Sequence, residues 1–214
     1  FFMAENDIFN IDIKGAEPSQ GCLLVAEPFL RERWFNHAVV YLFDYEGVAA
    51  GSMGVVLNHK MPISLWEIFP GPVPEDARKV DVKVWSGGPV GTDRLFFLHT
   101  LGPDIIPGAQ RISGTGVEDD TSMWLGGDFE AVCDYIAKGY PLDGHIRFFV
   151  GYSGWSMHQV DDEVATKVWA VIPEPLPAHL LLEGGGDSVW HNMVNLLGDA
   201  YKSWRLHPQD PSAN

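Results

Sequence analysis

The chain has 214 residues, of which 46% are hydrophobic, 20% charged and 12% aromatic, so it is too apolar for a disordered protein and shows no fibrous period. Its 29 acidic and 14 basic residues give a formal net charge of −15, which disfavours direct binding to nucleic acid or to anionic membranes. The length favours one domain that buries its own core.

The sequence also bears on the cellular compartment and on membrane segments. The longest uninterrupted apolar run, residues 38–43, is far shorter than the roughly 20 residues that span a bilayer. The N-terminal residues show no basic segment followed by an apolar one, so no secretory signal is expected. Cys22 and Cys133 show no metal-ligand spacing and fit a reducing compartment. We therefore expect a cytoplasmic protein without a membrane segment.

In chain order, residues 1–20 are polar and mixed and are predicted to form an N-terminal arm, with a single domain over 21–214. Runs of β-branched and aromatic residues bounded by turn residues then predict seven strands. These lie at 22–26, 38–43, 53–58, 80–85, 95–100, 146–150 and 167–172. A short helix is predicted over 64–69, where Pro70 stops it.

The clearest helix is predicted over 128–138, with Asp128 as its cap and Gly139 as its end. Its apolar residues recur at helical spacing and form one stripe: Phe129, Val132, Cys133 and Ile136. Cys133 is therefore a predicted core residue. Two later helices are predicted over 156–165 and 188–204, the second capped by Asp187 or Ser188. Early strands with late, irregular helices indicate an α+β fold with a mixed, largely antiparallel sheet.

Three glycine-bounded segments are the candidates for a ligand site. Residues 86–89 and 125–128 contain paired glycines but lack the lysine of a phosphate-binding loop, and the segment around Ser153 has Trp155 where a hydrolase elbow needs glycine. Tight turns are the simpler interpretation, with Ser153 as a turn or helix-capping residue. The alternative is that they converge on one small-molecule pocket. That candidate pocket comprises Asn58, Ser86, Gly87, Gly88, His99, Gly126, Gly127 and Ser153.

Metal and cofactor signatures are absent from the sequence pattern. None of the eight histidines pairs with another at ligand spacing, and the acidic clusters at 118–120 and 161–163 lack the spaced ligands of a calcium loop. We therefore predict no metal, no cofactor and no catalytic residue. A site assembled from histidines distant in sequence stays open.

The predicted C-terminal helix is apolar around well over half of its circumference, more than one core-facing stripe requires. Packing against the body explains part of this. The rest favours a protein partner or self-association, because tryptophan and tyrosine are effective interface anchors. The candidate interface comprises Trp190, Met193, Leu197, Tyr201 and Trp204, and the glycine-rich residues 183–187 would let the helix reposition.

The motifs taken together resemble the YqgE/AlgH family of bacterial proteins. They are GCLLVAEP at 21–28, FNHAVV at 35–40, GVVLN at 54–58, SGGPV at 86–90, LHT at 98–100, LGGD at 125–128 and RFFVGYSGW at 147–155. The resemblance covers about residues 20–172. The C-terminal stretch departs from the commoner arginine-rich ending and is closer to a Bacteroidetes-like branch.

The resemblance implies a single α+β domain with a bent or partly barrel-like sheet surrounded by helices, and no established catalytic residues. The family label of transcriptional regulator fits poorly with a net charge of −15 and no basic helix. Our first hypothesis is a non-enzymatic interaction or regulatory module that acts through protein partners. The second is a small-molecule-binding protein or enzyme with a glycine-bounded pocket, and the third is direct DNA binding.

Overall fold

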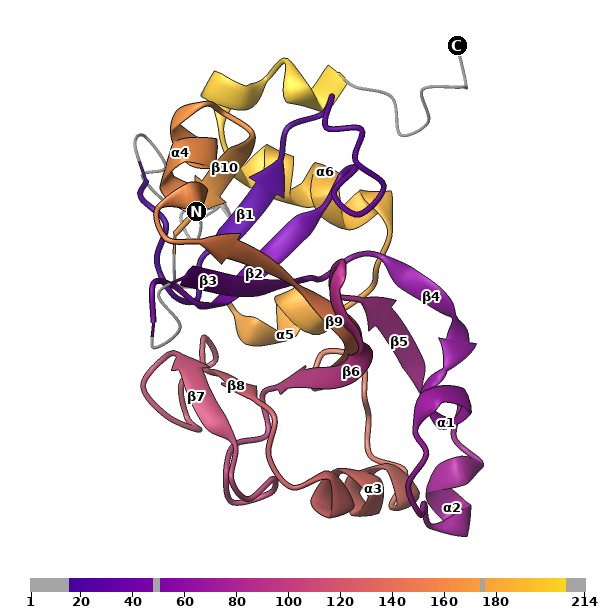
Figure 1. Cartoon of the computed structure of the whole chain (residues 1–214). Coiled ribbons are helices and arrows are strands. Elements are labelled where there is room, and N and C mark those ends of the chain that lie inside the picture. The colour runs from indigo at the N-terminus through magenta and orange to yellow at the C-terminus, as the bar shows by residue number, and fades with distance from the viewer. Residues whose placement is uncertain (1–15, 48–50, 174–175, 207–214) are drawn as a thin grey trace, which may run out of the picture.

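Ten strands of the computed structural model join into one sheet flanked by six helices, within the described residues 16–47, 51–173 and 176–206 (Figure 1). The strands are β1 (Leu23–Ala26), β2 (Val39–Asp44), β3 (Gly51–Val56), β4 (Lys60–Ser64), β5 (Lys83–Ser86), β6 (Val90–His99), β7 (Gln110–Ser113), β8 (Met123–Leu125), β9 (Ile146–Ser156) and β10 (Trp169–Ile172). The helices are α1 (Leu65–Ile68), α2 (Glu75–Arg78), α3 (Phe129–Ala137), α4 (Gln159–Ala165), α5 (Ala178–Leu182) and α6 (Asp187–Leu196). The predicted α+β class with a bent, mostly antiparallel sheet is confirmed.

Strand β9 holds the two halves of the sheet together. Its C-terminal part pairs with β3, where Ser156 lies opposite Gly51, and its N-terminal part lies between β6 and β5. The pairing with β5 is parallel, whereas the other pairings of the described strands are antiparallel. Figure 1 shows β9 crossing from the upper half of the molecule to the lower half. The sheet therefore bends about one long shared strand.

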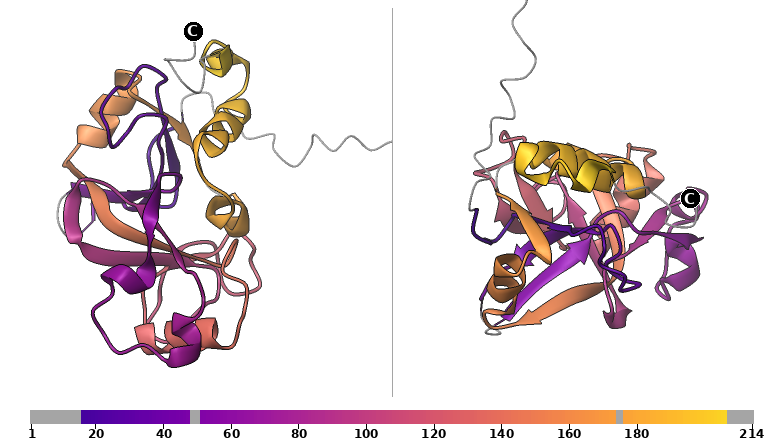
Figure 2. Two further views of the ribbon diagram at one scale, coloured as in Figure 1. Left: turned by 90° about the vertical axis from the view of Figure 1, so that its right-hand side faces the viewer. Right: turned by 90° about the horizontal axis from the view of Figure 1, so that it is seen from above.

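The alternation of side chains along β1 and β2 builds two cores, one on each face. Leu23 packs in a cluster with Trp190 of α6, whereas the next residue, Leu24, packs in a cluster with Val160 of α4. In the left view of Figure 2, α6 (yellow) and α4 (orange) accordingly lie on opposite sides of these strands. Helix α6 is thus a covering layer of the sheet.

A third core lies between the sheet and α3, at the lower end of Figure 1. Val132 and Ile136 of α3 pack in one cluster with Phe148 of β9. Asp128 caps the helix by accepting the Glu130 N–H at 3.0 Å. Both the position of this helix and its cap are as predicted, because stripe, cap and terminating glycine all point to the same boundaries.

The helix predicted over 156–165 begins three residues later, at Gln159. The reason is that β9 continues through Ser156, beyond the end predicted at Val150. Gly151 does not break the strand. Its φ of 70° brings its backbone against the carbonyl oxygen of Gly88, where an added Cβ would lie 2.6 Å away. The glycine allows a close approach of β9 to the connection between β5 and β6, and does not form a turn.

The helix predicted over 188–204 ends at Leu196, and short 3-10 turns follow. Gly198 takes φ 77° and ψ −166°, a backbone conformation essentially restricted to glycine. The predicted caps are also wrong. The N-cap is Gly186, so Asp187 and Ser188 lie inside the helix.

All seven predicted strands are present with shifted ends, but β4, β7, β8, α2 and α5 were not predicted. Strand β4 contains Pro62, and the other four are too short to show a period. Most of the predicted arm lies outside the described residues, so the arm and the domain boundary at residue 21 stay predictions. No helix of the described part of the chain is long and apolar enough to cross a bilayer.

Candidate functional site

Ser153 lies inside β9 and is fully buried, so it is neither a turn residue nor a helix cap. Its Oγ donates to the carbonyl oxygen of Gly87 at 3.1 Å. Gly88 packs so closely that an added Cβ would lie 2.4 Å from that Oγ. Ser86 pairs with Val150, three residues before Ser153 in β9. These residues form a close contact between β9 and the segment after β5, and the serine hydroxyl is used in a hydrogen bond to a backbone carbonyl.

His99, Gly126 and Gly127 form a second, separate group. His99 is fully buried; the Leu101 N–H donates to its Nδ1 at 3.2 Å, so its Nε2 carries the proton that binds the Gly126 carbonyl at 3.0 Å. Burial lowers the pKa of His99 to about 4. His99 lies opposite Ile146 of β9, seven residues before Ser153 along the strand. The candidate residues around Ser153 and around His99 therefore lie in two separate groups, and a ligand at either group stays a prediction.

Asn58 is buried and joins three segments of the chain. Its Oδ1 accepts the Val39 N–H at 2.9 Å, and its Nδ2 donates to the carbonyls of His37 and Gly186, at 2.8 and 3.2 Å. The Gly186 N–H in turn donates to the Asn58 carbonyl at 2.8 Å. Asn58 thus fixes the start of α6 to the sheet, which is a positioning role and not a ligand contact.

Three of the five candidate interface residues, Trp190, Met193 and Leu197, are buried in the core. The Trp190 indole N–H donates to the Ala26 carbonyl at 2.9 Å, and its ring stacks on His37 with centroids 4.3 Å apart. The other two, Tyr201 and Trp204, are half-buried and pack against that core. Most of the excess apolar surface that the sequence shows is therefore used by packing within the chain.

Two hollows lie on either side of the segment that joins α5 to α6. The first, here the Trp85 cleft, has a volume of about 610 Å³. The second, here the α5–α6 groove, has a volume of about 460 Å³. Gly184 and Gly185 line both. Both volumes are within the range of small-ligand or peptide side-chain sites.

Arg147 supports this region from beneath, and sequence reasoning did not select it. Its side chain is 1% exposed and donates to the carbonyls of Leu57, Leu182 and Gly184 at 2.6 to 2.7 Å. The guanidinium stacks on the ring of Trp85, 4.2 Å from the centroid. Burial lowers the pKa of Arg147 to about 10, so it stays protonated at neutral pH. The available signal was an arginine inside an apolar strand, IRFFV.

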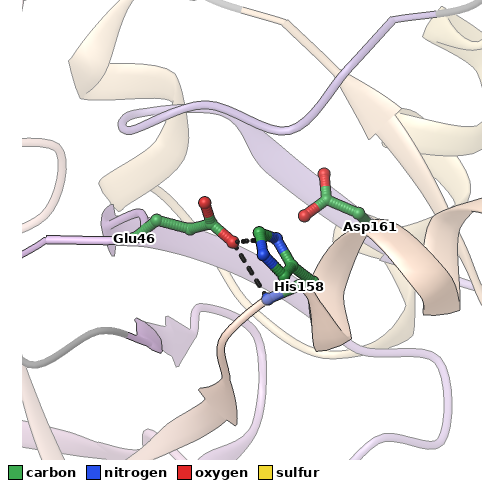
Figure 3. A group of neighbouring side chains, drawn as sticks. All are labelled: Glu46, His158 and Asp161. Atoms are coloured by element: carbon green, nitrogen blue, oxygen red, sulfur yellow. Dashed lines mark hydrogen bonds and ion pairs between the residues drawn. The ribbon is translucent and has the colours of Figure 1, made fainter.

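A further cluster consists of Glu46, His158 and Asp161 (Figure 3). Their ligand atoms lie within 4.8 Å of one another, close enough for a divalent cation after small adjustments. Each already has a partner within the chain. Glu46 accepts from Nδ1 of His158 at 2.9 Å, and Asp161 accepts the hydroxyl of Tyr45 at 2.8 Å. Burial, and then this hydrogen bond, raise the pKa of Tyr45 to about 12. The cluster is sufficiently explained as an ion-pair network that joins Tyr45 and Glu46, just after β2, to the start of α4.

Comparison with known proteins decides the family. The model of the AlgH-like family matches residues 23–202, most of the chain. This chain belongs to the AlgH-like family. The resemblance expected from the motifs is confirmed.

Relatives of the family align over nearly the whole chain. A UPF0301 protein of Parabacteroides distasonis is 38% identical over 97% of this chain and 98% of its own length. Another, from Bacteroides thetaiotaomicron, is 37% identical over 98% of both. Two solved structures share the fold. A protein of Corynebacterium diphtheriae has a TM-score of 0.66 at 19% identity, covering 95% of this chain and 99% of its own. AlgH of Pseudomonas aeruginosa has a TM-score of 0.60 at 24% identity, covering 87% and 93%.

Proposed function

We propose that this AlgH-like protein is a non-enzymatic interaction module that acts through a protein partner in the bacterial cytoplasm. The environments of Ser153 and Cys133 support this proposal, because neither environment favours a reactive nucleophile. Ser153 donates to a backbone carbonyl, and burial raises the pKa of the Cys133 thiol, which disfavours the reactive thiolate. The observation that carries the proposal is the α5–α6 groove.

The α5–α6 groove combines an apolar floor with an acidic rim. Leu181 and Met193 lie at its floor, and Leu180 is 40% exposed at its edge. The charged residues that line it are Asp143 and Glu183, both carboxylates. In a protein of net charge −15, this favours one kind of occupant. We expect a short amphipathic segment that places apolar side chains in the groove and lysine or arginine beside it.

Photo-crosslinking tests the groove directly. A photoreactive amino acid at Asn192, which lines the groove, should capture a defined bacterial protein through a segment with basic flanks. Leu180→Glu should weaken that capture at least tenfold, because it places a carboxylate on the apolar surface. High salt should weaken it as well.

The matched control is Ile68→Glu, because Ile68 of α1 is a similarly exposed apolar residue, 37% accessible against 40% for Leu180, and does not line the groove. It should leave the capture unchanged. Equal losses in both variants, or the same cross-link from a probe at Ile68, would contradict the proposal. Deletion of the residues after Gly186 is unsuitable, because it removes the buried Trp190 and Val194 and with them part of the core.

A further inference from the structure

The Trp85 cleft lies beside the α5–α6 groove but is lined differently. Its apolar surface comes from Val82, Leu142, Ile146 and Phe148, and lysines stand at its border. A binding site of this kind has an apolar body and a few polar groups that fix the orientation of a ligand. The polar groups identify which ligand would fit.

The first polar group is the indole N–H of Trp85. The side chain is 91% buried, and Nε1 has no hydrogen-bond acceptor among the described residues. A buried donor without an acceptor is costly, so an acceptor from outside the chain is favoured there. Gly185 faces this atom, and a Cβ added to it would lie 3.3 Å from Nε1. Because position 185 is glycine, no side chain from it covers the donor.

The second polar feature is positive charge. Arg147 stacks on the inner side of Trp85, and its nearest carboxylate, Asp143, is 4.0 Å away and mostly exposed. Lys60 lies directly opposite Trp85 in the pairing of β4 with β5. Lys83 lines the cleft too, in contact with Asp81. Two lysines and two aspartates line the cleft, and the buried Arg147 behind Trp85 adds one further positive charge, in a chain whose overall charge is strongly negative.

We propose that the Trp85 cleft binds a small amphipathic organic anion. Its anionic oxygen accepts the Trp85 indole N–H beside Gly185, within reach of the Lys60 ammonium, and its apolar body lies on Ile146 and Phe148. The buried charge of Arg147 favours an anion over a neutral or cationic analogue, since interactions between charges are weakly screened away from water. This inference does not depend on a protein partner.

Titration of the full chain with sodium octanoate tests the proposal, followed by the indole N–H resonances in NMR. The Trp85 resonance, assigned through Trp85→Phe, should move downfield in a saturable way. The octylammonium ion, with the same apolar tail and the opposite charge, should leave it in place. Lys60→Gln should weaken octanoate binding at least fivefold. Lys79→Gln, which changes an exposed lysine at the end of α2, should not.

A second variant keeps the test independent of the assignment. Gly185→Ala adds a methyl group in front of Nε1 without a demand on a left-handed backbone, and should weaken octanoate at least tenfold. The control Gly116→Ala, which meets no atom within 4 Å, should bind as the parent does. An unmoved Trp85 resonance, an equal response to octylammonium, or unchanged affinity in Gly185→Ala overturns the proposal. Leu180→Glu should bind octanoate normally, which separates this outcome from the fate of the α5–α6 groove.

Discussion

Arg147 joins three separate segments with one side chain, by donating to the carbonyls of Leu57, Leu182 and Gly184. Arg147→Met keeps much of the apolar stem but leaves these carbonyl oxygens without their donor. Because unsatisfied buried acceptors are costly, we expect the free energy of unfolding to fall by about 3 kcal/mol. Urea denaturation measures this. Arg94→Met, at an exposed position of β6, should change it by less than about 0.5 kcal/mol, and similar losses in both variants would contradict the assigned role.

His99 is a second residue whose environment has a measurable effect, here through pH. Burial in the folded protein lowers the pKa of His99 from 6.5 to about 4. Between these two pH values, His99 binds a proton in the unfolded chain but not in the folded chain. Stability should therefore be lost as the pH falls from about 6.5 to about 4, by up to about 1.4 kcal/mol per pH unit. His99→Gln removes this contribution. Unfolding of both proteins at pH 6.5 and 4.5 should show a smaller difference for the variant, and an identical difference would refute the burial argument.

At the level of elements, Gly198 decides where α6 stops. Gly198→Ala places a Cβ in a backbone conformation that only glycine tolerates, although no atom lies within 4 Å of it. We expect a loss of about 1 to 3 kcal/mol from backbone strain alone. Gly116→Ala is a matched control, because that glycine is also free of neighbours and has no positive φ. Thermal unfolding of the two variants separates backbone strain from a general effect of alanine. Equal melting temperatures would contradict the strain assigned to position 198.

The same elements show how far sequence reasoning reaches. Helix α3 is predictable because its apolar stripe, Asp128 cap and terminal glycine agree. Strand β9 is only half predictable, because Gly151 looks like a turn residue until its close approach to Gly88 is known. The Trp85 cleft is not predictable. It is assembled from segments around residues 60, 82, 146 and 185, and each contributes too few residues to form a motif.

For the whole molecule, the shared strand β9 predicts a single unfolding transition, although the sheet has two halves with separate cores. Phe148 packs in the core under α3, and the next residue, Phe149, packs in the core under α6. Unfolding of either half removes packing contacts from β9, and so destabilises the other half. Circular dichroism and tryptophan fluorescence should therefore give coincident unfolding curves, with equal calorimetric and van't Hoff enthalpies. Two resolved transitions would show that the halves are independent domains.

The pairing of β1 with β10 also bears on how the protein is made. Leu23 pairs with Ile172, 149 positions later. At the usual speed of a ribosome this interval takes roughly 7 to 30 s, during which β1 lacks one neighbouring strand, and β3 lacks one until β9 is made. A nascent chain halted before residue 146 exposes apolar strand edges that β9 and β10 would otherwise cover. Truncated translation products of this protein should therefore aggregate, and a chaperone that shields such edges would have its largest effect before the last third of the chain emerges.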